Sequence, residues 1–279
     1  MVKGNRDIRL VVSDMDGTLL DRDHRLPEGF WELERTLHER GIVFAVASGR
    51  QYWNLLDVFE PIADRILILA ENGTLVMQGG RQLHLRTLSR PDAHRFVELG
   101  RTLPQTHVLL CGKECAYVEG HDDQFLTSVR SFYRKVEIVP DLLAVQDDIL
   151  KVTYCDFRGA EEHSYPHVCR WSGDFKIAVA GIPWLDITHA QADKGVALAN
   201  IQERLGVTRA QTMVFGDYLN DLELMAGADW SFAMKNAHPR IVEAARFRTR
   251  LDHNEGGVLD TIRQVLFESA SSGFAADPG

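Results

Sequence analysis

The sequence predicts an α/β protein with a doubly wound, parallel-sheet, Rossmann-like core and an inserted α+β domain. Two observations indicate this architecture. Short apolar strands alternate with amphipathic helices in the first and last parts of the chain, which is typical of a parallel sheet covered by helices. Between these parts the alternation gives way to short amphipathic strands, so we expect a second domain inserted into the first.

The change in pattern sets the expected domain boundaries. Residues 1–86 and 189–268 are predicted to form the core, and residues 87–188 the inserted domain. Small and turn-forming residues dominate residues 269–279, and we expect this tail to fray.

The first part of the core is expected to hold three buried strands. Residues 8–13, 42–47 and 65–70 are short, apolar and rich in β-branched side chains, as buried parallel strands are. Pro27 opens a helix whose apolar positions share one face, and Gly41 ends it. The other elements expected here are a short helix at 52–59 and a hairpin of residues 74–77 and 82–86.

The strand–helix alternation returns after Asp193. We expect helices over 194–205, 219–226, 239–245 and 257–267, and strands over 212–215 and 231–234. In the inserted domain the candidate strands are 108–110, 116–118, 151–154 and 175–179.

The composition is that of an ordinary globular protein. Of the 279 residues, 45% are hydrophobic and 25% are charged, so a mainly disordered chain is not expected. The net charge of −9 argues against nonspecific binding to nucleic acid or to a membrane. The longest apolar runs, such as 66–70, are too short to span a bilayer. Residues 1–7 lack the apolar stretch of a secretory signal, so we do not expect one. The four cysteines lack zinc-site spacing, so we expect reduced thiols in a cytoplasmic protein.

Acidic residues follow two of the predicted core strands. Asp14 and Asp16 come directly after the first strand, where open α/β sheets bind ligands. Asp217 and Asp221 follow the apolar strand 212–215, with Asn220 beside them. Carboxylates crowded in this way favour a hard cation such as Mg²⁺. Taken alone, the first pair is equally compatible with a polar turn. The second pair favours a functional site over a capped helix start, because an apolar strand changes sharply to Gly-Asp.

Two further clusters lie at predicted helix starts. Ser48, Gly49 and Arg50 follow the second strand, where a hydroxyl and free N–H groups can bind a phosphate oxygen. Lys194 opens a helix and is suited to pair with a carboxylate or a phosphate. Each alone is read more simply as a helix cap. Because strand ends of a parallel sheet meet at one edge, the clusters together indicate a site that holds a phosphoryl group against Mg²⁺.

These residues, in this order, resemble the haloacid dehalogenase-like (HAD) hydrolase superfamily. The similar motifs are Asp14-x-Asp16-Gly17-Thr18-Leu19, Ser48, Lys194 and Gly216-Asp217-x-x-Asn220-Asp221. The insertion between the second and third motifs resembles the C2B cap of the Cof-type sugar-phosphatase branch. The segments Asn72-Gly73 and Ala233-Met234-Lys235-Asn236-Ala237 are also similar to signatures of this branch.

The resemblance implies a Mg²⁺-dependent phosphatase that acts on small phosphorylated metabolites, above all sugar phosphates. Asp14 would attack phosphorus to form an aspartyl-phosphate, and Asp16 would serve as general acid and base. The remaining implied roles are metal binding by Asp14, the Asp16 carbonyl, Asp217 and Asp221, and phosphate or substrate binding by Ser48, Gly49, Arg50, Asn72, Lys194 and Asn220.

Other readings stay open at this stage. A phosphomutase of the same branch would return the phosphoryl group to the substrate, and product analysis separates the two. A phospho-acceptor signalling protein also uses acidic residues, a hydroxyl and a lysine, although the pair Asp14 and Asp16 counts against it. A binding protein with a disabled site is a third reading. We expect a monomer or a small homo-oligomer. In the inserted domain, the candidate contacts to the leaving group are Trp184, His121, His163 and Arg158.

Overall fold

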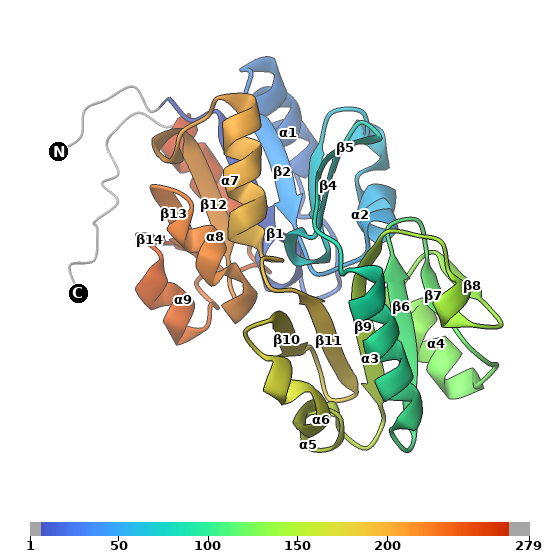
Figure 1. The fold of residues 1–279 in the computed structure, drawn as a ribbon. Coiled ribbons are helices and arrows are strands. Elements are labelled where there is room, and N and C mark those ends of the chain that lie inside the picture. The colour runs from blue at the N-terminus through green and yellow to red at the C-terminus, as the bar shows by residue number, and fades with distance from the viewer. Residues whose placement is uncertain (1–6, 268–279) are drawn as a thin grey trace. The chain divides into compact units, whose positions relative to one another are not determined.

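The computed structural model describes residues 7–267 (Figure 1). These residues form two compact units. The first contains residues 7–49, 61–83 and 193–267, and the second contains residues 50–60 and 84–192. In this part of the chain, no helix combines the length and apolar character that crossing a membrane requires. The expected tail at 269–279 lies outside the described residues.

An eight-stranded sheet forms the centre of the first unit. Its strands are β1 (Leu10–Asp14), β2 (Val43–Ala47), β3 (Leu67–Ala70), β4 (Leu75–Gln78), β5 (Arg81–Leu85), β12 (Thr212–Gly216), β13 (Trp230–Ala233) and β14 (Phe247–Arg248). They are ordered β14-β13-β12-β1-β2-β3-β4-β5. The pairs from β14 to β3 are parallel, whereas β4 runs antiparallel to β3. β1 is therefore flanked by parallel neighbours, and its carboxyl end points the same way as theirs.

Helices cover both faces of this sheet. They are α1 (Phe30–Glu39), α7 (Lys194–Leu205), α8 (Leu222–Ala226), α9 (Pro239–Ala244) and α10 (Gly257–Leu266). On one face, Leu198 of α7 belongs to the same buried cluster as Val12 of β1. On the other, the rings of Phe30 and Phe44 meet edge to face, with centroids 5.4 Å apart. The predicted doubly wound core is thus confirmed.

The second unit has a six-stranded sheet of its own. Its strands are β6 (Thr106–Gly112), β7 (Ala116–Val118), β8 (Val136–Ile138), β9 (Ile149–Asp156), β10 (Phe175–Val179) and β11 (Trp184–His189). They are ordered β10-β11-β9-β6-β7-β8, and all described pairs except the parallel pair β7 and β8 are antiparallel. The helices are α2 (Tyr52–Val58), α3 (Arg90–Thr102), α4 (Asp123–Phe132), α5 (Ala160–His163) and α6 (Tyr165–Val168).

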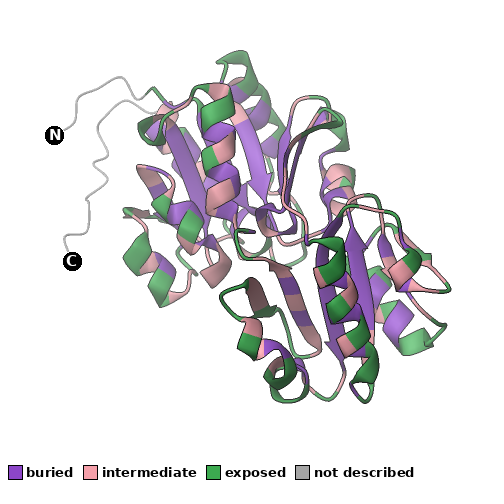
Figure 2. Ribbon diagram, in the orientation of Figure 1, coloured by how far each residue is buried: buried purple, intermediate pink, exposed green. Residues whose placement is uncertain are grey.

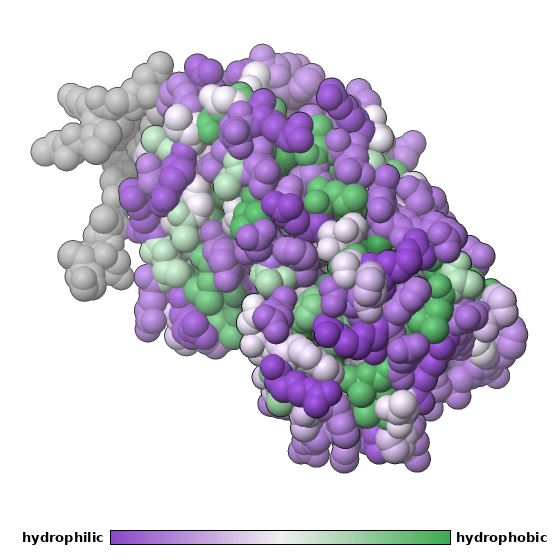
Figure 3. All heavy atoms as spheres, viewed as in Figure 1, coloured by the Kyte–Doolittle hydropathy of each residue, from purple (hydrophilic) through white to green (hydrophobic). Residues whose placement is uncertain are grey.

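Alternation along the strands divides this unit into two hydrophobic clusters. Phe96 of α3 packs with Val152 and Tyr154 of β9, whereas Phe125 of α4 packs with Cys155, which points to the other face. Figure 2 shows strands that are buried along most of their length and helices that alternate buried and exposed residues. In Figure 3, hydrophilic side chains surround small apolar patches on the visible face.

The helix α2 belongs to the second unit through the side chain of Gln51. Its Oε1 accepts hydrogen bonds from the backbone N–H groups of Arg134 (3.0 Å) and Lys135 (3.1 Å), and its Nε2 donates to the Lys135 carbonyl (3.2 Å). The Lys135 ammonium lies 3.0 Å from the centroid of the Trp53 ring. The chain therefore leaves the first unit directly after Gly49 and returns to it at Pro61.

Some expected elements differ from the observed ones. The helix expected to open at Pro27 begins at Phe30, because Gly29 adopts a left-handed conformation (φ 80°). The helix expected over 219–226 is a 3₁₀ turn at Leu219–Asp221 followed by α8. Strands β8, β11 and β14 were not predicted. Single 3₁₀ turns also lie at Glu60–Ile62, Glu71–Gly73, Leu142–Ala144, Cys169–Trp171 and Arg209–Gln211.

Candidate active site

The site begins at the carboxyl end of β1. Asp14 ends this strand and is paired in register with Ala47 of β2. The chain then turns through Met15–Leu19, where Gly17 has a φ of 78°. A Cβ atom at Gly17 would clash with the carboxylate of Asp217. Glycine is therefore required both for the left-handed backbone and for the approach of Asp217 to this turn.

Three carboxylates gather around one ammonium group. Oxygen atoms of Asp14, Asp217 and Asp221 lie within 4.8 Å of one another. Lys194 Nζ lies 2.6 Å from Asp14 Oδ1 and 2.7 Å from Asp221 Oδ1, and the lysine side chain is fully buried. The helix start that carries Lys194 is capped by Asp193, whose carboxylate accepts the N–H of Val196 (2.7 Å).

The charges in this cluster do not balance. Burial raises the pKa of Asp14 to about 8; the Asp221 and Asp217 carboxylates also raise it, and Lys194 opposes the shift. Burial and the neighbouring Asp221 raise the pKa of Asp217 to about 6. Burial alone would lower the pKa of Lys194, but the carboxylates of Asp14 and Asp221 raise it instead, so the lysine stays protonated. One ammonium cannot neutralise three carboxylates, and a divalent cation would supply the missing positive charge.

Hydrogen bonds hold the carboxylates of Asp217 and Asp221 in place. The Thr18 hydroxyl donates to Asp217 Oδ1 (3.0 Å). Asp221 Oδ2 accepts the backbone N–H groups of Asp217 (3.1 Å) and Tyr218 (3.4 Å). A Cβ atom at Gly216 would clash with the Asp221 carboxylate, so glycine at the end of β12 allows Asp221 to fold inward.

Ser48 and Asn72 lie at the carboxyl ends of the neighbouring strands. The N–H of Asn72 donates to the Ser48 carbonyl (2.9 Å), and Asn220 Nδ2 donates to Asn72 Oδ1 (3.0 Å). Asn72 has a left-handed backbone (φ 54°), and its amide lies against Gly49, where an added Cβ would be 3.2 Å from Nδ2. The structure thus brings Ser48, Gly49, Asn72 and Asn220 into one connected group.

Asp16 stands apart from the buried carboxylates. Its side chain is 45% exposed, and its Oδ1 lies 3.1 Å from His24 Nδ1. It is absent from the group of side-chain carboxylates that could share a metal ion, so a role in metal binding falls to its backbone carbonyl. That role stays a prediction.

Sequence reasoning did not assign several residues of this site. The sequence places Thr18 in the first motif without indicating its function. Asn236 lies in a segment similar to a family signature, again without an assigned function. Asn236 Nδ2 donates to the Gly17 carbonyl (2.8 Å), and its Oδ1 accepts the N–H of His253 (3.2 Å). His24 had no signal in the sequence beyond its position eight residues after Asp16.

The other candidates belong to the second unit. Arg50 begins its first segment, and its substrate role stays a prediction. Arg158 is engaged by Asp156, with Nη2 and Oδ2 2.7 Å apart. Trp184 meets Phe132 edge to face (5.7 Å), and His121 and His163 are exposed.

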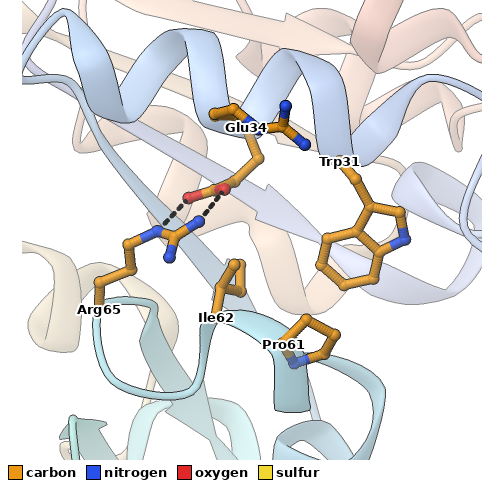
Figure 4. Close-up of a pocket in the computed structure, with 6 residues that line it drawn as sticks. Trp31, Glu34, Pro61, Ile62 and Arg65 are labelled. Atoms are coloured by element: carbon orange, nitrogen blue, oxygen red, sulfur yellow. Dashed lines mark hydrogen bonds and ion pairs between the residues drawn. The ribbon is translucent and has the colours of Figure 1, made fainter.

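A hollow of about 290 Å³ lies elsewhere on the first unit (Figure 4). Trp31, Glu34 and Arg35 of α1 line it together with Pro61, Ile62 and Arg65, which precede the amino end of β3. Arg65 binds the buried Glu34 carboxylate through two hydrogen bonds of 3.0 and 2.7 Å. The acidic cluster lies at the opposite, carboxyl ends of the strands, so this hollow is separate from the candidate site.

The fold and this set of residues define a hydrolase. The chain belongs to the family of haloacid dehalogenase-like hydrolases, which it matches over residues 11–262. Within that family it is a Cof-type phosphatase, a phosphoric monoester hydrolase.

Individual relatives agree with this assignment. The 5-amino-6-(5-phospho-D-ribitylamino)uracil phosphatase YbjI of Escherichia coli is 33% identical over 270 residues, 94% of this chain and 98% of the relative. The HMP-PP phosphatase of Cronobacter sakazakii is 28% identical, covering 84% of this chain and 86% of the relative. The solved structure of the HAD subclass IIB sugar phosphatase BT4131 shares the fold, with a TM-score of 0.75 and 19% identity over 92% of this chain and 98% of that one.

Proposed function

We propose that this protein is a Mg²⁺-dependent phosphatase that hydrolyses small phosphorylated metabolites, sugar phosphates among them, through an aspartyl-phosphate on Asp14. The observation that carries the proposal is the position of Asp14 at the end of β1, in contact with Lys194 and beside Asp217. A nucleophilic carboxylate must approach a phosphoryl group that is itself anionic. Positive charge beside both groups makes this approach possible.

The residues present fit a magnesium ion. The cluster offers only oxygen ligands, and its excess negative charge is buried, which suits a hard divalent cation. Asp14, Asp217 and the Asp16 carbonyl would hold the ion, with Asp221 supporting Lys194 and the turn at Asp217. When bound, Mg²⁺ withdraws negative charge from the phosphoryl oxygens.

The chain's own residues then perform two steps. An oxygen of Asp14 attacks phosphorus, the bond from phosphorus to the leaving oxygen breaks, and that oxygen keeps the electron pair and takes a proton from Asp16. Asp16, now a carboxylate, takes a proton from the water that attacks the aspartyl-phosphate. Phosphate leaves, and Asp14 is free again.

Further hydrogen-bond donors complete the site. We infer that the Ser48 hydroxyl, the Gly49 N–H and Lys194 bind the transferring phosphoryl oxygens. The contact between Asn72 and Asn220 supports this group, because it joins the loop after β3 to the loop after β12. We propose that Arg50 and Asn72 contact the substrate.

The substrate class is inferred from two considerations. The E. coli relative is named for a phosphorylated ribitylamino compound, and a structural relative is described as a sugar phosphatase.

We also propose that residues 87–188 are the inserted cap domain. The separate six-stranded sheet of the second unit supports this proposal.

The proposal is tested by measuring phosphate release with Mg²⁺ from a panel of sugar phosphates, sugar-alcohol phosphates, nucleotides, FMN and pyridoxal phosphate. We expect release that disappears with EDTA and in Asp14→Asn. Asp64→Asn is the matched control, because that carboxylate is 82% exposed and lies outside the cluster. Conversion of a substrate to an isomeric phosphate without release of free phosphate would instead identify a phosphomutase. Release that persists in Asp14→Asn would contradict the proposal.

A further inference from the structure

We propose that His24 is a positioning residue for Asp16: it binds one carboxyl oxygen and thereby assigns the transferable proton to the other. The observation is the hydrogen bond between His24 Nδ1 and Asp16 Oδ1, 3.1 Å long. The inference rests on the proposed function, in which Asp16 is the general acid and base. His24 itself contacts no reacting atom in this account.

A rigid turn presents the imidazole to Asp16. Asp21 Oδ1 accepts the backbone N–H groups of Asp23 (2.8 Å) and Arg25 (2.9 Å), and the N–H of His24 donates to the Asp21 carbonyl (3.0 Å). The turn is tied to a distant loop by the N–H of Arg22, which donates to the side chain of Asn254 (3.0 Å). Four hydrogen bonds thus fix the backbone that carries the imidazole.

The backbone of His24 is itself unusual. Its φ is 58°, in the left-handed region that most side chains avoid. Glycine or asparagine would occupy this position with less strain. Strained backbone conformations cluster at functional sites. Because the side chain of His24 contacts the proposed catalytic carboxyl group, we expect a functional reason for the strain.

The chemistry of the contact follows from the two groups. An ionised carboxylate offers only acceptors, so His24 Nδ1 is the donor. When Asp16 is protonated, the oxygen that already accepts from His24 is Oδ1, and the proton resides on Oδ2. As the phosphorus–oxygen bond breaks, the leaving oxygen keeps the bonding electrons and takes that proton, and Asp16 becomes a carboxylate again. His24 loses and gains nothing in this step.

An anchor matters because Asp16 is exposed. With 45% of its side chain accessible, this aspartate is less confined by packing than the buried Asp14. A proton transfer requires the donor oxygen within hydrogen-bond reach of the leaving oxygen. A fixed hydrogen bond from the turn narrows the orientations of the carboxyl group toward the productive one.

Three substitutions separate the side chain from the backbone. His24→Gly keeps the left-handed backbone and removes the donor. His24→Asn also tolerates that backbone and places an amide nitrogen where Nδ1 stands. His24→Ala removes the donor and adds strain. Asp23→Ala is the matched control in the same turn, because Asp23 contributes its backbone N–H.

The readout is kcat/KM for two kinds of substrate, because this ratio covers the steps through cleavage of the leaving group. An alkyl phosphate needs the acid, whereas p-nitrophenyl phosphate releases a stable phenolate without it. We expect His24→Gly and His24→Ala to lower kcat/KM for the alkyl phosphate about tenfold, part of the gain that general acid catalysis supplies. For p-nitrophenyl phosphate all variants stay close to the wild type, and His24→Asn recovers most of the alkyl activity.

Several results would overturn the inference. One is a His24→Gly variant with wild-type kcat/KM for the alkyl phosphate. Others are an equal loss on both substrates, or His24→Asn no better than His24→Gly, since these indicate a structural role of the turn. Asp16→Asn is measured in parallel. If Asp16→Asn keeps full activity on the alkyl phosphate, Asp16 is not the general acid, and the role of His24 is refuted together with it. If Asp16→Asn is inactive while His24→Gly has wild-type activity, only the role of His24 is refuted.

Discussion

Lys194 and Asp14 are separated by 180 positions in the chain, yet Lys194 Nζ lies 2.6 Å from Asp14 Oδ1 inside the protein. The same ammonium reaches Asp221 at 2.7 Å. One buried cation therefore joins the end of β1, the start of α7 and the loop after β12. Isolated buried charges are unfavourable, so removing any member of this group leaves the others poorly compensated.

The first prediction concerns Lys194. Lys194→Met keeps the side-chain length and removes the charge, which leaves the Asp14 and Asp221 carboxylates buried beside each other. We expect the free energy of unfolding to fall by about 3 kcal/mol, the lower end for breaking a buried ion pair, because a carboxylate can take up a proton. Phosphatase activity is lost as well. Urea denaturation measures the change.

Lys235→Met is the matched control for this variant. Lys235 pairs with Glu255 at 3.3 Å, but both side chains are about half exposed. Exposed pairs contribute little, so its stability is expected to match the wild type within about 0.5 kcal/mol. Equal stability of Lys194→Met and the wild type would contradict the account of the buried group.

The second prediction concerns metal binding. Because a ligand that binds the folded state raises the melting temperature, Mg²⁺ is expected to raise the Tm of the EDTA-treated protein. Asp217→Asn removes a ligand and part of the excess negative charge, so the response to Mg²⁺ should disappear while the metal-free Tm stays the same or rises. Differential scanning fluorimetry with and without Mg²⁺ measures both. A full Mg²⁺ response in Asp217→Asn would place the metal elsewhere.

The third prediction concerns Gly17. An added Cβ would meet the Asp217 carboxylate, and the φ of 78° adds strain for any other residue. We expect Gly17→Ala to destabilise the protein by about 1–3 kcal/mol and to displace Asp217, so that activity and the Mg²⁺ response fall together. Gly80→Ala has the same kind of backbone (φ 74°) but open space around it. Gly80→Ala therefore shows the effect of backbone strain without displacement of Asp217. Equal effects of Gly17→Ala and Gly80→Ala on activity would refute the role assigned to Gly17.

The fourth prediction concerns acid stability of the second unit. Burial would raise the pKa of Asp156, but hydrogen bonds from Arg158 and Ser164 outweigh it, and the pKa lies below its usual value. A lowered folded-state pKa stabilises the fold above the unfolded-state pKa, near 4, and this stability is lost as the pH falls through the folded-state value. We expect the free energy of unfolding to drop as the pH is lowered from about 5 to 3.

Asp156→Asn tests the origin of that loss. Its Oδ2 accepts from Arg158 Nη2 (2.7 Å) and from the Ser164 hydroxyl (3.1 Å), so we expect the substitution to cost about 2 kcal/mol near pH 7. The cost should shrink toward pH 3, because the wild-type carboxylate is then being protonated. The exposed Asp174→Asn serves as control. A cost that does not change with pH would show that the charge of Asp156 is not responsible.

The residues at strand ends were predictable because a parallel sheet brings the carboxyl ends of its strands to one edge. Asp14, Ser48 and Asp217 each follow an apolar run that the sequence marks clearly, and their order matches the family. Contacts made by returning loops were not predictable. Asn236 reaches Gly17 from a position 219 residues away, and no local pattern specifies that distance.

The missed strands have a similar explanation. β8 has three residues and pairs only with another three-residue strand, so its few apolar positions give no periodic signal. β14 has two residues. The left-handed backbone of Gly29 delays the start of α1. The pattern of apolar residues carries no information about this backbone conformation. His24 was missed because its turn is held by side-chain and backbone contacts that composition does not reveal.

Trapping the phosphoryl group on Asp14 tests the aspartyl-phosphate mechanism most directly. In Asp16→Asn, p-nitrophenyl phosphate can still phosphorylate Asp14, because its leaving group needs no proton, but the variant lacks the base that activates water. We expect a burst of p-nitrophenol close to one per active site. In the acid-quenched protein, the phosphoryl group should map by peptide mass to Asp14. Turnover with no burst and no phosphoryl group on Asp14, or with the group on another residue, would contradict this mechanism.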